Sequence, residues 1–478
     1  MGCLRQSITF LYRINSGESK MQHTDIKVLF KNGGEFTGKD VTVCGWVRTW
    51  RDSKSIAFIE LNDGTSLKNL QLVIEKESVS DDVVKPALVV GAALKVIGKF
   101  IPSERNGYEM SVKSIEVLGG CPNDYPLQKK HHTLEFLRTI PHLRPRTRYF
   151  EAVFAVRNAL AFAIHKYFNG NGYKYVHTPI ITGSDCEGAG EMFRVTTQSW
   201  DAKYKTEQEY FADDFFGAKA GLTVSGQLEG ECAAMGLGKI YTFGPTFRAE
   251  HSNTTRHAAE FWQIEPEVCF CDLQDIIGIA EDFIKSIIKD VLENCAEELA
   301  FFEERVEKGL LDKLRSVIES DFGKITYTEA VEVLKKSGKE FKYPVEWGCD
   351  LQTEHERYLT EEYFKKPVFV TDYPADIKAF YMKQNPDNKT VAATDLLVPG
   401  IGEIIGCSER EADFEKLKAA MLKRNMPLES YTEYLDTRKY GSVPHSGFGL
   451  GFERMLMYVT GVQNIRDTLL YPRTVGSL

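Results

Sequence analysis

Several features that define other protein classes are missing from this chain. No apolar run approaches the roughly 20 residues needed to span a bilayer. The ten cysteines are scattered, with no CxxC pair and no Cys/His cluster at the spacing of a zinc site. We therefore expect a protein without membrane spans, whose thiols stay reduced and buried in a reducing compartment.

A basic surplus is also missing, although proteins that bind nucleic acid through charge alone usually have one. The net charge is -9 and the isoelectric point is about 5.7. Any contact with RNA must therefore use a local patch rather than the whole surface. Hydrophobic residues make up 43% and aromatic residues 12% of the 478 residues, which predicts two or three globular domains with a large core.

The common nucleotide-binding fingerprints are absent too. No GxxxxGK[ST] motif occurs, and no glycine-rich loop has the context of a dinucleotide fold. The stretch GFGLGFER at 447–454 instead predicts a glycine-rich strand that opens into a helix. Its glycines would let a flat ring approach the sheet backbone closely.

The first twenty residues allow two interpretations. Arg5, Arg13 and Lys20 stand against one acid, Glu18, which is compatible with a weak transit peptide. The alternative is an inert extension ahead of a start at Met21. Myristoylation is disfavoured, because it needs Ser or Thr where Gln6 stands. We favour the extension and hence the cytoplasm, with an organelle matrix as the location if the segment is a transit peptide.

Residues 41–118 contain five short strand patterns at hairpin-like spacing, which suit a small barrel of the OB type. We assign 39–119 to this domain and 1–38 to an extension before it. Arg51, Phe58 and Gln71 offer a cation, a stacking ring and an amide, which together make a platform for single-stranded RNA. The alternative is that Phe58 belongs to the core and Arg51 is merely solvated.

The next segments predict a linker, a long helix and an edge strand. Residues 120–148 hold four prolines and no clear period, as a connector does. The apolar residues of 151–168 repeat at helical spacing, and glycines follow. A strand over 173–181 carries Pro179, which is tolerated at an edge or an interface.

Residues 240–270 predict two strands joined by a long polar turn. Arg248 and Glu250 lie two apart, so on a strand they point to one face. A ligand with an anionic group and a donor edge would satisfy both side chains. The alternative for an isolated RxE pair is a surface salt bridge.

Residues 272–345 read as a mostly helical, charged insertion whose Glu/Lys runs are solvated faces. Strand character returns afterwards. The segment GEIIGCSER at 402–410 carries Glu403 and Arg410.

Three of these segments resemble the motifs of one family. Phe-Arg-x-Glu at 247–250, a polar loop and Arg-His-x-x-Glu-Phe at 256–261 resemble motif 2 of the class II aminoacyl-tRNA synthetases. The long helix with the Pro179 strand is similar to motif 1, and GFGLGFER is similar to motif 3. The resemblance runs from about residue 38 to the C-terminus and is strongest to the asparaginyl enzymes of class IIb.

The resemblance implies an α+β protein: an OB barrel followed by a catalytic domain at 149–478 with an antiparallel sheet flanked by helices. It implies ATP-dependent ligation of L-asparagine to tRNA(Asn) through an adenylate, with Mg²⁺, by a homodimer. The alternatives are an aspartyl-tRNA synthetase, either discriminating or nondiscriminating, an inactive synthetase-like RNA-binding subunit and an asparagine synthetase of similar fold.

The resemblance also assigns roles to residues. Arg248 and Arg454 would be the catalytic cations, and Pro179 would mark the dimer interface. The other implied positions are Glu250, His257, Phe261 and Glu403 for ATP, with Glu403 also holding the metal; Glu187, Ser225, Gln227, Glu260 and Arg410 for the amino acid; and Arg51, Phe58 and Gln71 for the anticodon.

Two positions depart from the aspartyl pattern. Gly406 stands where aspartyl relatives have a serine that assists the metal, so the metal shell is expected to differ. Gly230 stands three residues after Gln227, where those relatives have a lysine. Without that second cation, the pocket should favour an amide, whose nitrogen needs an acceptor such as Glu260.

Overall fold

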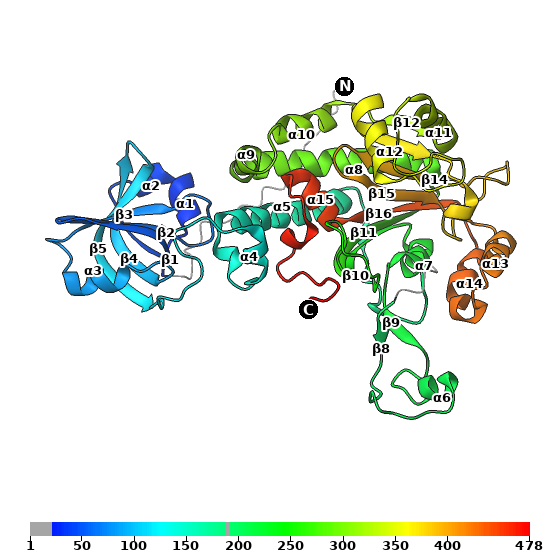
Figure 1. Cartoon of the computed structure of the whole chain (residues 1–478), viewed down its shortest axis with the longest axis horizontal. Helices are drawn as coiled ribbons and strands as arrows, with labels where there is room; N and C mark the ends of the chain where they lie inside the picture. Colours follow the sequence, from blue (N-terminus) through cyan, green and yellow to red (C-terminus); the bar gives the residue numbers. More distant parts are fainter. Residues whose placement is uncertain (1–21, 187–191) are drawn as a thin grey trace, which may run out of the picture. The chain divides into compact units, whose positions relative to one another are not determined.

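The computed structural model of the chain describes residues 22–186 and 192–478. They form two compact units, one up to Glu151 and the other from Ala152 to Leu478. In Figure 1 the first unit is coloured from blue to cyan, and the second continues through green to red.

A closed five-stranded barrel is the centre of the first unit, in the order β1-β2-β3-β5-β4. Alternation along β2 buries Ala57, Ile59 and Leu61 and leaves Phe58 and Glu60 outside the core. The predicted OB-type barrel is confirmed. Its strands are β1 (Asp40–Asp52), β2 (Ile56–Asn62), β3 (Leu70–Glu75), β4 (Ala93–Ser103) and β5 (Gly107–Gly119).

The segments on either side of the barrel are more ordered than the sequence predicted. Helices α1 (Ile26–Lys31) and α2 (Gly33–Phe36) precede β1, and Ile26 and Leu29 are fully buried in the barrel core. Residues 26–36 therefore belong to the barrel, and their assignment to an extension was wrong. The predicted linker holds a short helix, α4 (Leu134–Arg138).

An eight-stranded sheet organises the second unit, in the order β12-β13-β14-β15-β16-β11-β10-β6. The six central strands pair antiparallel, and the outermost pairs on both sides are parallel. The strands are β6 (Lys174–Tyr175), β10 (Lys239–Phe247), β11 (Glu260–Cys269), β12 (Gly323–Thr326), β13 (Val368–Thr371), β14 (Ala393–Val398), β15 (Gly402–Glu409) and β16 (His445–Gly451).

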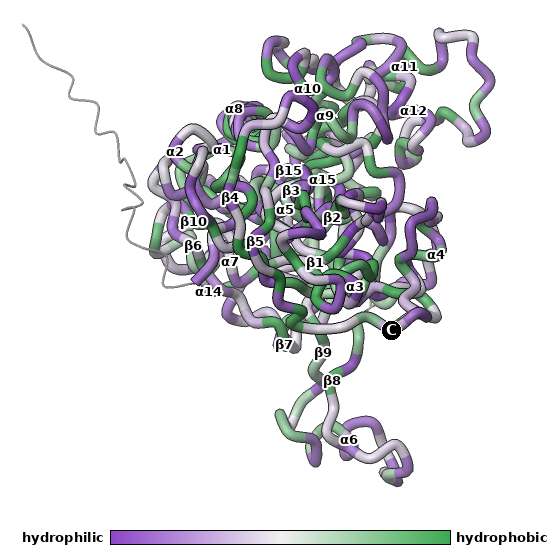
Figure 2. The backbone as a smooth tube through the Cα atoms, turned by 90° about the vertical axis from the view of Figure 1, so that its left-hand side faces the viewer, coloured by the Kyte–Doolittle hydropathy of each residue, from purple (hydrophilic) through white to green (hydrophobic). Residues whose placement is uncertain are grey.

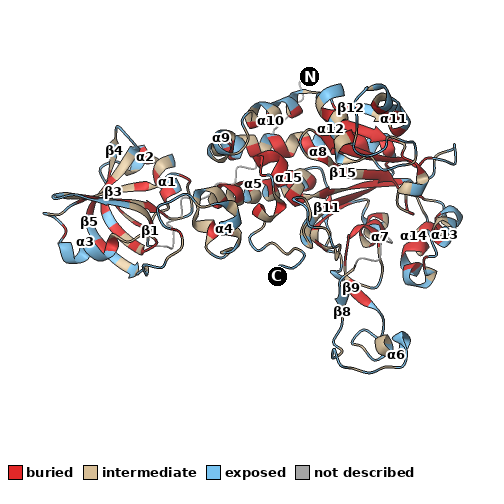
Figure 3. Cartoon of the chain, in the orientation of Figure 1, coloured by how far each residue is buried: buried red, intermediate tan, exposed pale blue. Residues whose placement is uncertain are grey.

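Helices α8 (Leu273–Asn294) and α15 (Phe452–Thr460) pack against this sheet, and α5 (Arg148–Gly170) reaches it through the Phe168 ring, which stacks on Tyr241 of β10 at 4.6 Å. Phe283 of α8 contacts both a helix and a strand. Its ring centre lies 4.8 Å from that of Phe168 in α5 and 5.7 Å from that of Phe448 in β16. Figure 3 shows the buried residues gathered where helices and strands meet. None of the described helices is long and apolar enough to cross a bilayer.

The segment 272–345 is helical, as predicted, but it is not a separate insertion. Besides α8 it contains α9 (Ala296–Arg305), α10 (Leu310–Glu319) and α11 (Tyr327–Lys336). It also supplies β12, one of the two edge strands of the sheet. The segment therefore completes the sheet and covers it.

The predicted strand over 173–181 is much shorter in the structure. Only Lys174 and Tyr175 pair with β10, and the next strand, β7, is Ile181–Thr182. Pro179 lies in the irregular backbone between them, so its placement in a strand was wrong. A residue without an N–H cannot extend the ladder.

A projecting arm, residues 192–222, is the feature that the sequence did not predict. It contains β8 (Arg194–Val195), α6 (Glu207–Ala212) and β9 (Ala220–Leu222). Strands β7, β9 and β8 form a small separate sheet. Two perpendicular views show the arm extending away from the large sheet, and Figure 2 shows apolar residues among polar ones along it.

Candidate active site

Strands β11 and β16 form the floor of the candidate site on one face of the sheet. Along β11, Phe261, Gln263, Glu265 and Glu267 share a face because side chains alternate with period two. The antiparallel partner β16 places glycines beside them, with Gly447 opposite Glu267. A Cβ at Gly447 would lie 2.2 Å from Glu267 Oε1, so only glycine fits there.

One end of this face is a cavity lined by every side chain that the sequence predicted to bind ATP. Arg248 Cζ lies 5.4 Å from the centre of the Phe261 ring, so one planar ligand could contact both side chains. Arg248 and Glu250 follow the end of β10, so their prediction as strand residues was wrong, although they share a cavity. The lining includes Arg248, Glu250, His257, Phe261, Gln263, Glu403, Gly449, Gly451 and Arg454.

Three carboxylates crowd the edge of this cavity. Asp395 pairs across β14 and β15 with Gly406, and a Cβ at Gly406 would lie 3.3 Å from Glu403 Oε1. Burial, with Glu403 and Asp395 nearby, raises the pKa of Glu356 to about 8. Burial also raises the pKa of Asp395, although the Lys378 ammonium lies 2.6 Å away. Asp395 and Glu356 were not among the residues predicted from the sequence; the available signal for Asp395 was an acid inside the apolar strand TDLLV.

Arg410 lies at the opposite end of the floor, between two buried carboxylates. It donates to Glu267 through Nη2 to Oε1 at 2.5 Å and through Nε to Oε2 at 3.2 Å. Its Nε also lies 3.8 Å from Glu231 Oε1, and its Nη1 donates to Ser408 Oγ at 2.6 Å. Burial, with Glu231 nearby, raises the pKa of Glu267 above its ordinary value, even though Arg410 favours the ionised form.

Glu231, on α7 (Gln227–Leu237), is fully buried and surrounded by donors. Tyr434 Oη donates to its Oε2 at 2.8 Å, and Arg438 pairs with the same oxygen. His445 Nε2 lies 3.1 Å away. Burial alone would raise the pKa of Glu231, but Arg438 and His445 hold it below its ordinary value. The carboxylate is therefore ionised and locked in position.

Two of the predicted amino-acid-binding residues, Ser225 and Gln227, donate hydrogen bonds to buried glutamates near Arg410. Ser225 Oγ donates to Glu265, and Gln227 Nε2 donates to Glu231 Oε1 at 2.9 Å. Gln227 begins α7 rather than continuing a strand. Glu187, predicted to contact the substrate ammonium, lies outside the described residues.

Glu260 is not an amide acceptor beside Arg410. It is the exposed first residue of β11, and it differs in parity from Glu267, so its side chain leaves the opposite face of the strand. Glu267 takes its place as the acceptor candidate, and the signal in the sequence was the second acid of QIEPE.

Two family models match the chain. The model of class II tRNA synthetases (D, K and N) covers residues 134–475, and the model of the OB-fold nucleic acid binding domain covers residues 41–118. The larger match spans the whole site described above.

The chain belongs to the class II tRNA synthetases.

Close relatives of this synthetase are named asparagine–tRNA ligase. That of Clostridium perfringens is 56% identical over 456 residues, 95% of this chain and 98% of the relative. That of Acetivibrio thermocellus is 55% identical over 96% of this chain and 99% of the relative. Among solved structures, asparaginyl-tRNA synthetase from Pyrococcus horikoshii complexed with asparaginyl-adenylate is 34% identical, with a TM-score of 0.84 over 96% of this chain and 99% of that chain.

The barrel of this class II tRNA synthetase places its three predicted RNA-binding side chains on adjacent strands outside the core. Arg51 pairs with Phe58 across β1 and β2, and its guanidinium lies 5.3 Å from the Phe58 ring centre. Gln71 of β3 donates to Glu109 Oε2 at 2.9 Å. Phe58 is half-buried and lies outside the barrel core, so the alternative of a core phenylalanine was wrong.

Proposed function

We propose that this synthetase joins L-asparagine to ATP, giving asparaginyl-adenylate and diphosphate, and then transfers asparagine to the 3′ end of tRNA(Asn) with release of AMP. The observation that carries the proposal is the buried group around Arg410, which has two carboxylates and two guanidinium groups and so no net charge. The names of the close relatives, and the asparaginyl-adenylate bound in the Pyrococcus horikoshii enzyme, support the same substrate.

The side-chain subsite suits an amide. Arg410 can donate to the amide oxygen, while the Glu267 carboxylate accepts from the amide nitrogen. Aspartate would instead place a carboxylate against Glu267. Gly230 has no side chain and therefore supplies no second cation. The position is close to the pocket, because a Cβ built there would lie 3.8 Å from Glu267 Cγ. An unpaired buried charge is costly, so aspartate is rejected.

Activation requires cations rather than a base, because the attacking carboxylate is already ionised. Arg248 would hold the substrate carboxylate and the α-phosphate, and Arg454 the γ-phosphate of a bent ATP. Phe261 would stack on the adenine ring, with Glu250 and His257 at the same cavity. These residues bring two anions together in line for displacement of diphosphate.

Mg²⁺ fits the carboxylates at the edge of this cavity. Among the described residues no three acidic, His or Cys side chains already form a metal cage. Mg²⁺ needs less, because one or two carboxylates suffice when the nucleotide supplies phosphate oxygens. Glu403 and Asp395 would hold the ion, which would neutralise phosphate charge. Gly406 leaves the space between them open.

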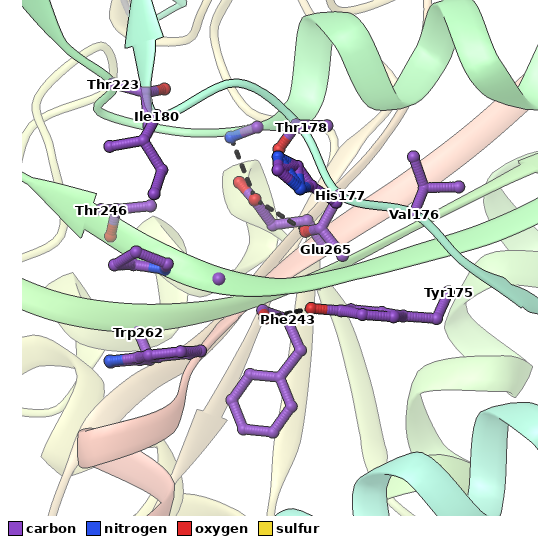
Figure 4. Close-up of a pocket in the computed structure, with 14 residues that line it drawn as sticks. Tyr175, Val176, His177, Thr178, Ile180, Thr223, Phe243, Thr246, Trp262 and Glu265 are labelled. Carbon is purple, nitrogen blue, oxygen red and sulfur yellow. Dashed lines mark hydrogen bonds between the residues drawn. The ribbon is translucent and has the colours of Figure 1, made fainter.

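A second copy of the chain suits the apolar surface beside β6. Phe162 of α5 is 72% exposed, and Tyr175 and Ile180 are also exposed. A pocket next to them reaches Glu265, whose Oε2 accepts from Gly226 N at 3.1 Å (Figure 4). Such a patch on the motif 1 segment favours a homodimer. A monomeric mass for the active enzyme at micromolar concentration, by light scattering, contradicts this assignment.

The outer face of the barrel would read the anticodon with Phe58 as the stacking ring and Arg51 and Gln71 beside it. Protein synthesis places the enzyme in the cytoplasm, or in an organelle matrix if residues 1–20 direct it there.

Charging of a tRNA(Asn) transcript with labelled amino acid tests the whole reaction: asparagine should be attached, and attachment of aspartate alone would overturn the proposal.

A further inference from the structure

Three aromatic side chains of the arm are turned to solvent. Trp200 is 96% exposed, Phe215 74% and Phe216 51%. Rings of this size are usually mostly buried, and a group of exposed ones marks a binding surface.

The arm does not use these three rings for its own fold. Arg194 Cζ lies 5.3 Å from the ring centre of Phe211 and 5.8 Å from that of Tyr210, which in turn packs against Tyr204. Asp214 Oδ1 accepts from the backbone N–H of Thr197 at 2.9 Å. Other residues therefore hold the arm together, while Trp200 and the edge-to-face pair of Phe215 and Phe216, whose ring centres lie 4.9 Å apart, stay exposed to solvent.

The arm has no surplus of positive charge, because Arg194 and three lysines stand against five acidic side chains, so any phosphate contact must be local to the exposed lysines. Lys203, Lys205 and Lys219 are exposed, and none makes an ion pair within the described part of the chain. Four of the arm's five acidic side chains accept hydrogen bonds from donors within the arm. These four are Asp201, Glu209, Asp213 and Asp214. These hydrogen bonds fix the orientation of the four carboxylates, whereas the lysine side chains extend into solvent, where they can contact a ligand.

The arm stands beside the amino-acid pocket. Strand β9 ends at Leu222, three residues before Ser225. A hollow of about 950 Å³ at the base of the arm is lined by Lys219, by Glu229 of α7 and by Tyr434, whose hydroxyl donates to the buried Glu231. Five residues span at most about 18 Å, so Trp200 stays within that distance of Val195 at the base.

We propose that the arm binds the single-stranded 3′ end of the tRNA, with its exposed rings stacking on bases and its lysines facing the phosphates. Stacking rings interleaved with cations are the chemistry of single-strand binding, and they tolerate any base sequence. The inference rests on the proposed function, because it assumes that tRNA is the second substrate, and it adds a contact surface far from the barrel in sequence.

Kinetics of Trp200→Ala and of a Phe215→Ala/Phe216→Ala double variant test the proposal. Asparagine-dependent ATP–diphosphate exchange without tRNA should stay within twofold of wild type, which also shows that the variants fold. The kcat/KM for tRNA in charging should fall tenfold or more, and Trp200→Phe should restore most of it. Trp347→Ala removes another half-exposed tryptophan of the same unit and should change neither assay. Unchanged tRNA kinetics in both arm variants overturn the proposal.

Binding of intact tRNA and of tRNA trimmed of its unpaired 3′ nucleotides identifies the contacted part. Wild type should lose affinity on trimming, whereas Trp200→Ala should bind both forms alike. Equal weakening of both RNAs by Trp200→Ala contradicts the assignment to the 3′ end. A changed oligomeric mass with unchanged tRNA kinetics would assign the surface to a second copy instead. If wild type shows no asparagine-dependent exchange, the proposed function fails, whatever the arm binds.

Discussion

Arg410 and Glu267 form a two-point ion pair on the floor of the site, joined at 2.5 and 3.2 Å with both side chains buried. The pair links strand β11 to the residue that follows β15. A substrate side chain placed beside the pair meets a donor from Arg410 and an acceptor from Glu267. This polarity matches an amide and not a carboxylate.

Selectivity should depend on pH through Glu267. Its pKa is raised by burial, so it takes up a proton at a higher pH than an ordinary glutamate. Protonation removes the negative charge that excludes aspartate. The ratio of asparagine to aspartate activation should therefore fall as the pH is lowered from neutral to about 5.5, and the ratio should be lower and less dependent on pH in Glu267→Gln. A wild-type ratio that is constant over this range contradicts the role of Glu267.

Replacement of Gly230 by lysine should shift the pocket toward aspartate. A side chain at this position starts 3.8 Å from Glu267 Cγ, and its ammonium would supply the missing second cation. We expect the asparagine-to-aspartate ratio in exchange to fall tenfold or more. Gly230→Ala is the matched control, because a Cβ meets ordinary contact distances there, and it should leave the ratio unchanged. The same shift in both variants would point to shape rather than charge.

Arg248 and Arg454 are expected to stabilise the transition state of adenylate formation. Each Arg→Ala change should lower exchange by two orders of magnitude or more, about 3 kcal/mol. Arg305→Ala, on the exposed end of α9, serves as the control and should be neutral. Near-wild-type exchange by a folded Arg248→Ala variant would remove that residue from the mechanism.

Phe58→Ala should separate the two substrates of the reaction. Loss of a stacking ring should weaken charging by about 1–3 kcal/mol and leave exchange intact, because exchange needs no tRNA. Leu72→Ala, at a fully buried position of the same barrel, is the contrasting variant and should lower stability instead. Equal losses of charging and exchange in Phe58→Ala would mean that the residue supports folding.

Local patterns predicted most of the elements. The period-two runs of the barrel, the helical repeat of α5 and the glycine-rich strand β16 were each readable from the sequence. The motif resemblance also gathered Arg248, Phe261 and Arg454 correctly into one cavity.

The errors came from positions that only tertiary pairing decides. Whether Glu260 or Glu267 faces Arg410 depends on which residue of β11 stands opposite Gly447, and spacing within one strand cannot show that. The sequence around Pro179 predicts a strand, and only the structure shows that no neighbouring strand pairs with this residue. The arm has no strong period, since its strands are only two or three residues long.

The central claim is that the pocket selects asparagine by charge, and ATP–diphosphate exchange with each amino acid at matched concentration tests it most directly. The measurement uses the wild-type enzyme at neutral pH with Mg²⁺ and without tRNA. Asparagine should be activated at least a hundredfold better than aspartate, roughly 2.7 kcal/mol. Activation of aspartate within tenfold of asparagine would contradict the account and favour an aspartyl enzyme.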